Sequence, residues 1–294
     1  MGTSRVGIVT ESVATVPAAD VQRLGIEVVP LPVRFGTEEF LDGADLSAED
    51  FYRRMVADEV VPTTSAPSPD AYEQACRRAL AAGADELIVL TLAASLSAAH
   101  EAAVAGTADL EVPVHVIDTG TAAAAEGILV RYCAELVASG APAAEAVAAV
   151  EQIRDRVVLY AVIPTLTYLR RGGRVGRLRG FAGDRLGIRP LVCLRGGEVG
   201  GSGVVRRMDA GFDRMVELVR RAGQGAAGLE VVVTHANAPE DAATLAARFD
   251  GVGLRRPVDV VPFTPVMGAH TGPGAVGLAY GAFPAQAPLP PVAR

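Results

Sequence analysis

The sequence contains neither lysine nor tryptophan in its 294 residues, and the missing lysine limits what the protein can do. All 27 basic residues are therefore arginines. A P-loop nucleotide site is excluded, because that motif requires a lysine at the phosphates. The net charge of −7 also argues against nucleic acid as a partner, since nucleic-acid-binding proteins present a basic surface.

Cysteine and histidine are scarce as well. The three cysteines, Cys76, Cys133 and Cys193, lie far apart without a C-x-x-C pair, so neither a disulfide framework nor a zinc site is indicated. The four histidines are isolated from one another, and we expect no metal and no cofactor. No uninterrupted apolar run reaches the roughly 18 residues that span a bilayer. These absences favour a globular protein of the reducing cytoplasm.

The first half of the chain alternates between apolar runs and helical patterns. Strands are predicted over 6–10, 25–35, 86–91 and 114–118, and helices separate them. Such repetition is typical of parallel β-α-β units with both sheet faces covered. Polar loops then gather at the carboxyl ends of the strands, where α/β proteins bind their ligands.

The second half is predicted to form another α/β unit. Its elements begin with a strand at 157–163 and continue with a hairpin, two helices and two further strands, at 191–206, 210–222, 241–249, 230–234 and 258–263. We place the boundary near Arg156, which gives domains at 1–156 and 157–283. The Pro- and Ala-rich tail, 284–294, is expected to be disordered. The predicted fold class is therefore α/β, with two α/β domains.

A stretch near the end of the chain, 266–274, combines a histidine, a hydroxyl and two glycines. It follows a predicted strand and precedes a helix predicted over 274–282, so free N–H groups and the positive end of the helix dipole would form a small anion site. Gly-Pro-Gly is also ordinary loop punctuation, and both interpretations stay open. Gly272, Gly274 and Gly277 match a dinucleotide fingerprint, but no acidic residue follows Gly274, which excludes that function.

Arginines cluster between residues 170 and 179. Arginine suits the forked recognition of carboxylate or phosphate. Arg170, Arg177 and Arg179 are expected on a solvated loop. Arg174 follows two glycines that allow a close backbone approach, so we expect it to contact either a ligand or an interdomain carboxylate.

The hydroxyls of Thr63, Thr64 and Ser65 lie just before a helix that we expect Ser68 to cap. They are candidates for ligand contact, although such runs are usually local turn chemistry. No nucleophile elbow is present, because Val rather than Gly stands two positions after Ser202. Hydrogen-bond donors without a nucleophile favour binding over turnover, and we assign no catalytic residue.

With these stretches assembled, the sequence resembles the DegV family of bacterial fatty-acid-binding proteins from Val6 to about Phe283. The resemblance implies two α/β domains with a ligand crevice between them, in which a fatty acid lies with its tail in an apolar tunnel. It also implies that the protein presents the acyl group to a separate fatty acid kinase, which makes the acyl phosphate used in phospholipid synthesis. The motifs that carry it are Thr10-Glu11-Ser12, Pro62-Thr63-Thr64-Ser65-Ala66-Pro67-Ser68, Ser95-Leu96-Ser97, Ile117-Asp118-Thr119, Gly172-Gly173-Arg174, Ile188-Arg189-Pro190 and His270-Thr271-Gly272-Pro273-Gly274.

Carried over by position, the resemblance implies a carboxylate site and a neighbouring surface. Arg206 is implied near the head group or the kinase, and transient membrane contact fits the same role. Burial of about sixteen acyl carbons would supply on the order of 10 kcal/mol before ordering costs. The residues implied to hold the carboxylate are Thr63, Thr64, Ser65, Ser95, Arg174, His270 and Thr271.

The chain departs from the family pattern at several positions. Ala93-Ala94 stands where the family has a Ser-Ser pair, so Ser95 or Ser97 would have to replace the missing hydroxyl. Glu11 stands where the family has an aspartate. Two alternatives therefore stay beside the carrier function: an enzyme that acts on an acyl or phosphorylated substrate at the same crevice, and a binding fold for another small carboxylate.

Overall fold

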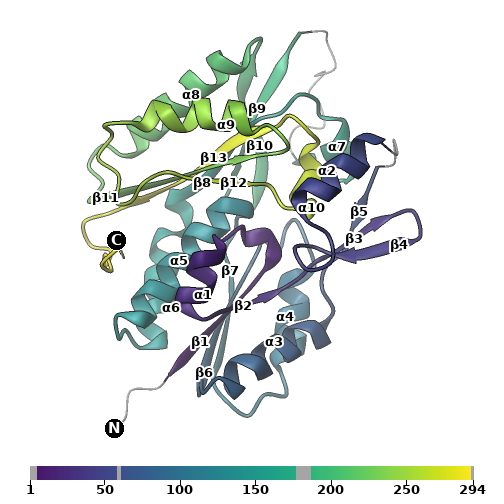
Figure 1. Cartoon of the computed structure of the whole chain (residues 1–294). Helices are drawn as coiled ribbons and strands as arrows, with labels where there is room; N and C mark the ends of the chain where they lie inside the picture. The colour runs from purple at the N-terminus through teal and green to yellow at the C-terminus, as the bar shows by residue number, and fades with distance from the viewer. Residues whose placement is uncertain (1–4, 58–60, 177–186, 293–294) are drawn as a thin grey trace.

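The computed structural model describes residues 5–57, 61–176 and 187–292, and its first sheet is parallel throughout (Figure 1). The strand order is β2-β1-β6-β7, with β1 at Val6–Glu11, β2 at Ile26–Val29, β6 at Glu86–Thr91 and β7 at Val114–Asp118. Helices α3 (Pro69–Ala81) and α4 (Ala99–Thr107) cover one face, and α1 (Ala18–Leu24) lies on the other. The predicted parallel β-α-β units are confirmed.

Local signals fixed the start and the end of α3 as predicted. The Ser68 hydroxyl accepts a hydrogen bond from the Ala71 N–H at 3.2 Å, and Pro69 occupies the first helical turn. Gly83 follows the helix with a φ of +100°, which favours glycine. The polar loop before α3 is thereby held at the carboxyl edge of the sheet.

The single strand predicted over 25–35 is wrong, because the chain breaks there into two strands of different sheets. Pro30 and Pro32 lack the N–H groups that a continuous central strand needs. After β2, β3 (Pro32–Phe35) forms a small antiparallel sheet with β4 (Glu38–Leu41) and β5 (Thr63–Thr64), and α2 (Ala48–Ala57) packs beside it.

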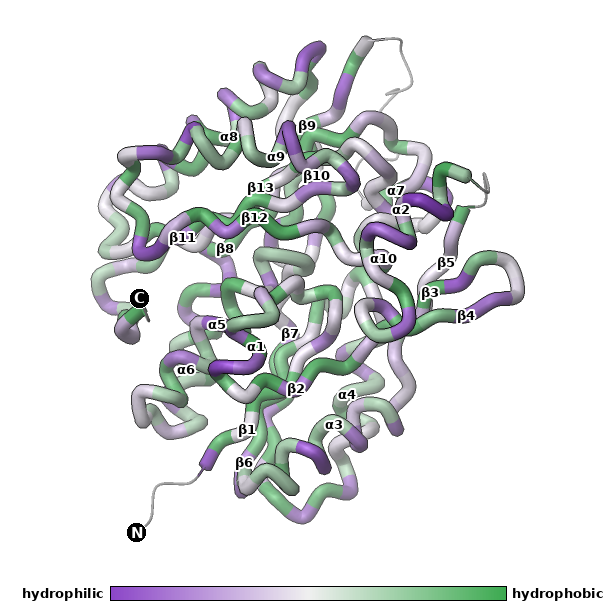
Figure 2. The backbone as a smooth tube through the Cα atoms, in the orientation of Figure 1, coloured by the Kyte–Doolittle hydropathy of each residue, from purple (hydrophilic) through white to green (hydrophobic). Residues whose placement is uncertain are grey.

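The second sheet is mixed and lies above the first in Figure 1. Its outer face is covered by α8 (Met208–Ala222) and α9 (Pro239–Ala246). Figure 2 shows hydrophobic residues along the strands and hydrophilic residues on outer helices such as α8. The described strand order is β10-β9-β8-β13-β11-β12, with β8 Val157–Val162, β9 Arg189–Arg195, β10 Glu198–Val205, β11 Gly228–His235, β12 Asp259–Pro262 and β13 Val276–Phe283.

The helix predicted over 274–282 is wrong, because this segment is the central strand β13. All eight of its residues are buried, so it has the continuous apolar pattern of a strand covered on both faces, which periodicity cannot separate from a buried helix. Gly277 permits the close approach of β8, since a Cβ there would lie 2.5 Å from the Tyr160 carbonyl oxygen. The helix that does form, α10 (Pro265–Thr271), comes before the glycines.

Helix α5 (Ala123–Ala138) lies between the two sheets and packs against β1, β8, β11 and β13. Its residues from Ala123 to Leu136 are all buried, and one hydrophobic core extends from the first sheet through α5 to the second. Helix α6 (Ala143–Ile153) follows it, and β8 begins at Val157. The domain division near Arg156 stays a prediction, because the two units share this core.

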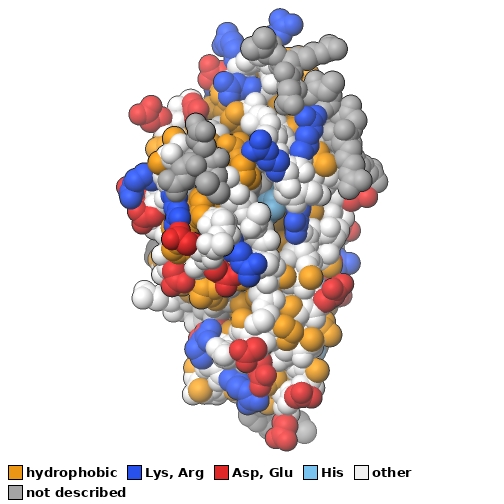
Figure 3. Space-filling model, turned by 90° about the vertical axis from the view of Figure 1, so that its right-hand side faces the viewer, with side chains coloured by type: hydrophobic (Ala, Val, Ile, Leu, Met, Phe, Trp, Pro, Cys, Tyr) orange, Lys and Arg blue, Asp and Glu red, His pale blue; other side chains and the backbone are white. Residues whose placement is uncertain are grey.

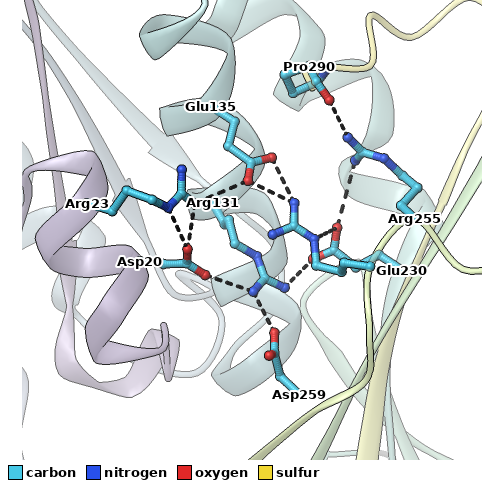
Figure 4. A network of polar contacts seen from close by, with 9 residues as sticks. Asp20, Arg23, Arg131, Glu135, Glu230, Arg255, Asp259 and Pro290 are labelled. Atoms are coloured by element: carbon cyan, nitrogen blue, oxygen red, sulfur yellow. Dashed lines mark hydrogen bonds and ion pairs between the residues drawn. The ribbon is translucent and has the colours of Figure 1, made fainter. Parts of the chain in front are cut away.

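A buried group of charged residues joins α5 to both units (Figure 4). Arg131 on α5 is only 2% exposed, and its guanidinium pairs with Asp20 of α1 at 3.1 Å, with Asp259 of β12 at 2.7 Å and with Glu230 of β11. Arg256 bonds Glu135 of α5 at 2.8 Å. Burial alone would lower the pKa of Arg131, but the three carboxylates raise it, so the residue stays charged.

Residues 284–292 of the tail, which we expected to be disordered, instead pack on the molecule. The Tyr132 hydroxyl of α5 donates to the Pro288 carbonyl at 2.8 Å, and Arg255 donates to the Pro290 carbonyl at 2.9 Å. Ala287 is buried. Prolines without N–H groups need no strand partner, so the segment is held by its carbonyl oxygens and apolar contacts.

Candidate functional site

A pocket that is partly open to solvent lies between the second sheet and the loops at the carboxyl edge of the first. Strands β8, β9 and β10 contribute to its wall, β8 through the alternate residues Leu159 and Ala161, which point to the same face of the sheet. The apolar lining consists of Val13, Leu31, Leu92, Leu96, Ala122, Leu159, Ala161, Ile163, Leu169, Val192, Leu194, Val199, Phe263, Val266 and Met267.

Polar residues occupy one part of the wall. Thr64 of β5 and His270 of α10 come together there, with 2.9 Å between the Thr64 hydroxyl oxygen and His270 Nε2. Ser65 also lines the pocket, whereas Thr63 is exposed and does not. Thr63 and Thr64 are neighbours in β5, so only one of them can face the ligand side.

His270 is a neutral side chain near pH 7. Burial first, and the charge of Arg174 second, lower its pKa to about 4. Its Nδ1 is buried and has no hydrogen-bond partner among the described residues. Gly172 packs directly against the ring, and a Cβ at that position would collide with Nδ1. Gly172, two residues before Arg174, is therefore required by the histidine.

Arg174 supplies the positive charge of the site. It follows α7 (Thr167–Arg171), and its side chain donates to two backbone carbonyls, from Nε to Leu96 at 3.0 Å and from Nη1 to Gly172 at 2.7 Å. No ion pair joins it to any carboxylate within 5–57, 61–176 or 187–292. Arg174 was predicted to contact either a ligand or an interdomain carboxylate. Among the described residues it has no carboxylate partner, so the predicted interdomain salt bridge is not formed there.

The remaining predicted residues divide between the pocket and its surroundings. Thr271 lines the pocket, but its hydroxyl donates to the Met267 carbonyl at 3.0 Å. Ser97 lines it as well. Ser95 lies outside, where its hydroxyl donates to the Gly197 carbonyl in the turn between β9 and β10. Arg206 is exposed beyond β10 and is not among the lining residues.

A shallower, more polar depression continues outward from the pocket. The two share Leu96, Arg174 and Val199, and the depression adds Ser95 and Gly197. Arg174 therefore stands between the apolar interior and the outside. Figure 3 shows the face that carries α2, α7 and α10, on which arginine side chains gather in the upper part with hydrophobic side chains between them.

The prediction that a helix N-terminus near residue 274 supplies the positive charge of an anion site is wrong. His270 lies in the last turn of α10, at the negative end of the helix, because the following segment is a strand. The positive charge comes from the Arg174 guanidinium instead. Arg170 is exposed, as predicted, but it lies in α7 rather than in a loop, whereas Arg177 and Arg179 lie outside the described residues.

The sequence did not reveal a buried pair of carboxyl groups behind the pocket. Glu11 accepts from the Tyr72 hydroxyl at 2.6 Å and from the Leu92 N–H at 3.0 Å, and Glu126 of α5 faces it. Burial raises the pKa of Glu11, and burial together with the Glu11 charge raises the pKa of Glu126 further. Glu126 is thus held protonated beside Glu11, which in turn accepts from the N–H of Leu92, a pocket residue.

Within the described ranges, no cluster of three or more His, Cys, Asp or Glu side chains could hold a metal ion. The helices of the same ranges include none with the length and apolar character needed to cross a membrane. What the site offers is therefore an apolar cavity, one cation, and the neutral hydrogen-bonding groups of Thr64 and His270.

Comparison with known proteins gives consistent matches along the chain. The model of the DegV family of uncharacterised proteins matches residues 5–282. A DegV domain-containing protein of Streptomyces coelicolor is 36% identical, over 93% of this chain and 97% of its own. A fatty acid-binding protein of Thermotoga maritima is 28% identical, over 93% of this chain and 96% of its own. A solved fatty-acid-binding DegV family protein of Thermus thermophilus superimposes with a TM-score of 0.87 at 27% identity, covering 95% of this chain and all of that one.

Proposed function

Because the chain belongs to the DegV family, we propose that it binds a long-chain fatty acid in the cytoplasm, with the acyl chain in the pocket and the carboxylate at Arg174. The observation that carries this proposal is the pocket itself: an apolar cavity that meets one arginine without a carboxylate partner in the described chain. The relatives from Thermotoga maritima and Thermus thermophilus are named for fatty acid binding, which supports the ligand class.

The apolar wall supplies affinity in this proposal. About 0.8 kcal/mol per buried CH₂ gives on the order of 10 kcal/mol for sixteen carbons before ordering costs. Strands β8 and β9 present Leu159, Ala161, Val192 and Leu194 on one face, so the tail would lie against a continuous aliphatic surface. Chains of different length would bind with affinities that rise with the number of methylenes inside.

The polar part of the wall supplies orientation. Arg174 is fixed by two carbonyl oxygens, which leaves its positive charge to be neutralised by the ligand. His270 Nδ1 is covered by Gly172, so the hydrogen-bonding group here is the Thr64 hydroxyl, which His270 Nε2 holds in place. A carboxylate here would gain charge-assisted hydrogen bonds at little cost in ordering, because the protein groups are already in place.

The finer part of the proposal is that the bound acid is presented to a separate fatty acid kinase. Arg174 lies where the pocket opens into the outer depression, so a carboxylate at Arg174 would be the end of the ligand nearest to the surface. A partner enzyme could then phosphorylate the carboxylate while the tail stays buried. The acyl phosphate would serve phospholipid synthesis.

A catalytic role at the pocket would depend on its hydroxyl–histidine pair, Thr64 and His270, and the electrostatics of that pair are unfavourable. Thr64 lies 2.9 Å from His270, but a histidine with a pKa of about 4 is a weak general base near pH 7. No carboxylate in the described chain orients the other ring nitrogen. We therefore assign binding rather than turnover.

Mass spectrometry of small molecules released from the denatured, freshly purified protein tests the proposal. We expect a fatty acid at close to one per chain, and micromolar or tighter rebinding after delipidation. Ala161→Phe should fill the pocket and abolish rebinding, whereas Tyr160→Phe, on the opposite face of β8, should leave it unchanged. A protein that carries no fatty acid and takes up none after delipidation would refute the proposal.

A further inference from the structure

Asp42 is a buried carboxylate that none of the binding steps above requires. It follows β4, is 2% exposed, and accepts a hydrogen bond from the Ser12 hydroxyl at 2.9 Å. Its own N–H donates to the Leu31 carbonyl at 2.9 Å. Ser12 in turn accepts from the Leu31 N–H at 3.2 Å. The contacts close a ring of three residues that are distant in sequence.

The same carboxylate faces the start of α10. The Thr264 hydroxyl and the Val266 N–H lie on that side of Asp42 and lower its pKa. Beside them, the Tyr52 hydroxyl of α2 donates to the Phe263 carbonyl at 3.3 Å. The segment that begins α10 is therefore hydrogen-bonded by α2 and lies beside the Asp42 carboxylate.

The residues that these contacts fix are pocket residues. Leu31 belongs to the ring itself, and Val13 follows Ser12 directly. Phe263 and Val266 belong to the segment that Asp42 and Tyr52 hold. One carboxylate thus bonds two chain segments and lies beside a third, and together these segments provide four apolar wall residues of the pocket.

Asp42 lowers the stability of the fold near neutral pH. Burial raises its pKa to about 6, against the lowering effect of the nearby Thr264, Ser12 and Val266 groups, and Oδ1 has no hydrogen-bond partner in the described chain. A carboxyl whose folded pKa is raised adds stability that is complete at acid pH and is lost as the pH rises through about 6. At pH 7.5 the group is ionised, at a cost to folding.

We propose that Asp42 is a positioning residue of the fatty-acid site, whose ionised carboxylate holds the Ser12–Ala14 turn, the loop before β3 and the start of α10 together as one apolar wall. This inference rests on the proposed function. The titratable groups around Asp42 are Tyr52, whose phenol is buried and neutral, and Asp45 in the same turn, which is exposed and accepts from the Leu41 N–H.

Asp42→Asn tests the inference, with Asp45→Asn as the matched control in the same turn. At pH 7.5 we expect Asp42→Asn to bind fatty acid about tenfold more weakly while its thermal midpoint stays equal or rises. The affinity difference from wild type should shrink as the pH falls from 7.5 to 5.5, because Asp42 of the wild type becomes protonated. Asp45→Asn should match wild type throughout.

Hydrogen exchange of residues 264–271 in the ligand-free protein gives a second readout that needs no ligand. We expect faster exchange in Asp42→Asn and unchanged exchange in Asp45→Asn. If both the affinity and the thermal midpoint fall in Asp42→Asn, Asp42 is merely structural. If the affinity of this variant is unchanged, the positioning role is refuted. A wild type that binds no fatty acid would refute the proposed function instead, and exchange would then decide by itself whether Asp42 holds α10.

Discussion

Two arginines at the junction of the two sheets have opposite surroundings. Arg131 is 2% exposed and is paired with Asp20, Glu230 and Asp259, so its charge is compensated inside the protein (Figure 4). Arg174 is half-buried and bonds to two neutral carbonyl oxygens, without a carboxylate in the described chain. Both lie between elements of the two units, yet only one has its charge balanced.

This difference separates a structural arginine from one that is prepared for a ligand. A buried ion pair whose partner is removed leaves an uncompensated charge, which costs several kcal/mol. An arginine that is positioned by neutral carbonyl groups keeps its geometry, but its charge is fully stabilised only when an anion binds. Substitutions at the two positions should therefore act on different properties, Arg131 on unfolding and Arg174 on affinity.

The largest effect is expected from Arg131→Met. Asp20, Glu230 and Asp259 would be left without their shared cation, and we expect the free energy of unfolding to fall by about 3–5 kcal/mol in urea denaturation. Adding Glu230→Gln should recover part of the loss, because the two residues are coupled. Arg77→Met, at an exposed pair with Glu73, should cost less than about 0.5 kcal/mol. Equal losses at both arginines would contradict the structural assignment of Arg131.

Arg174→Gln should act on the ligand. We expect fatty acid affinity to fall by about 2 kcal/mol, roughly thirtyfold in Kd, with an unfolding free energy close to wild type. Calorimetric or fluorescence titration of the delipidated protein measures it. Arg171→Gln, three residues earlier and exposed, is the control and should bind normally. If both variants bind as wild type does, the carboxylate is held elsewhere.

Glu126→Gln examines the reverse case, a buried acid without a cation. Because burial and Glu11 raise its pKa, the acid adds stability at low pH that is lost as the pH rises through the folded value. The amide cannot ionise, so the variant should be more stable than wild type by about 1 kcal/mol at pH 9, the size of an ordinary stabilising substitution. The two should converge toward pH 5 in thermal unfolding. A variant that is less stable at every pH would contradict a protonated Glu126.

The smallest effect is expected from His270→Gln. The neutral ring contributes hydrogen bonds rather than charge, so affinity should fall by about 1 kcal/mol, roughly fivefold. A histidine with a lowered pKa adds stability at neutral pH that is lost as the pH falls from about 6.5 toward 4, so the variant should also resist acid better than wild type. His235→Gln, outside the pocket, should not change affinity. A loss as large as that of Arg174→Gln would mean that His270 carries charge.

The fold was predictable where local signals agree with tertiary structure. Ser68, Pro69 and Gly83 mark both ends of α3, and the alternation of strands and helices predicts the parallel sheet. Strand β13 was mistaken for a helix because a strand buried on both faces loses its period of two. That error also moved the supposed helix dipole to the wrong side of His270.

The sequence predicted which residues belong to the polar site, but not which of them face the ligand. The resemblance brought Thr63, Thr64, Ser65, Arg174 and His270 together, and only the twist of β5 and the position of α10 decide that Thr64 rather than Thr63 reaches the histidine. The apolar lining has no motif, because aliphatic residues that face a cavity look like any core residues in sequence. Asp42, Glu126 and Arg131 have partners 30 to 128 residues away, which a single sequence cannot show.

The position of β13 has a consequence for how the protein is made. It is the last strand in the described part of the chain, yet it lies between β8 and β11 at the centre of its sheet. On the ribosome, β8–β10 and β11–β12 must wait as two separate halves, and α5 stays uncovered on one side until residue 283 has emerged. The second sheet therefore cannot close before residue 283 has emerged, and deletion of β13 would leave the edges of β8 and β11 that it covers unpaired.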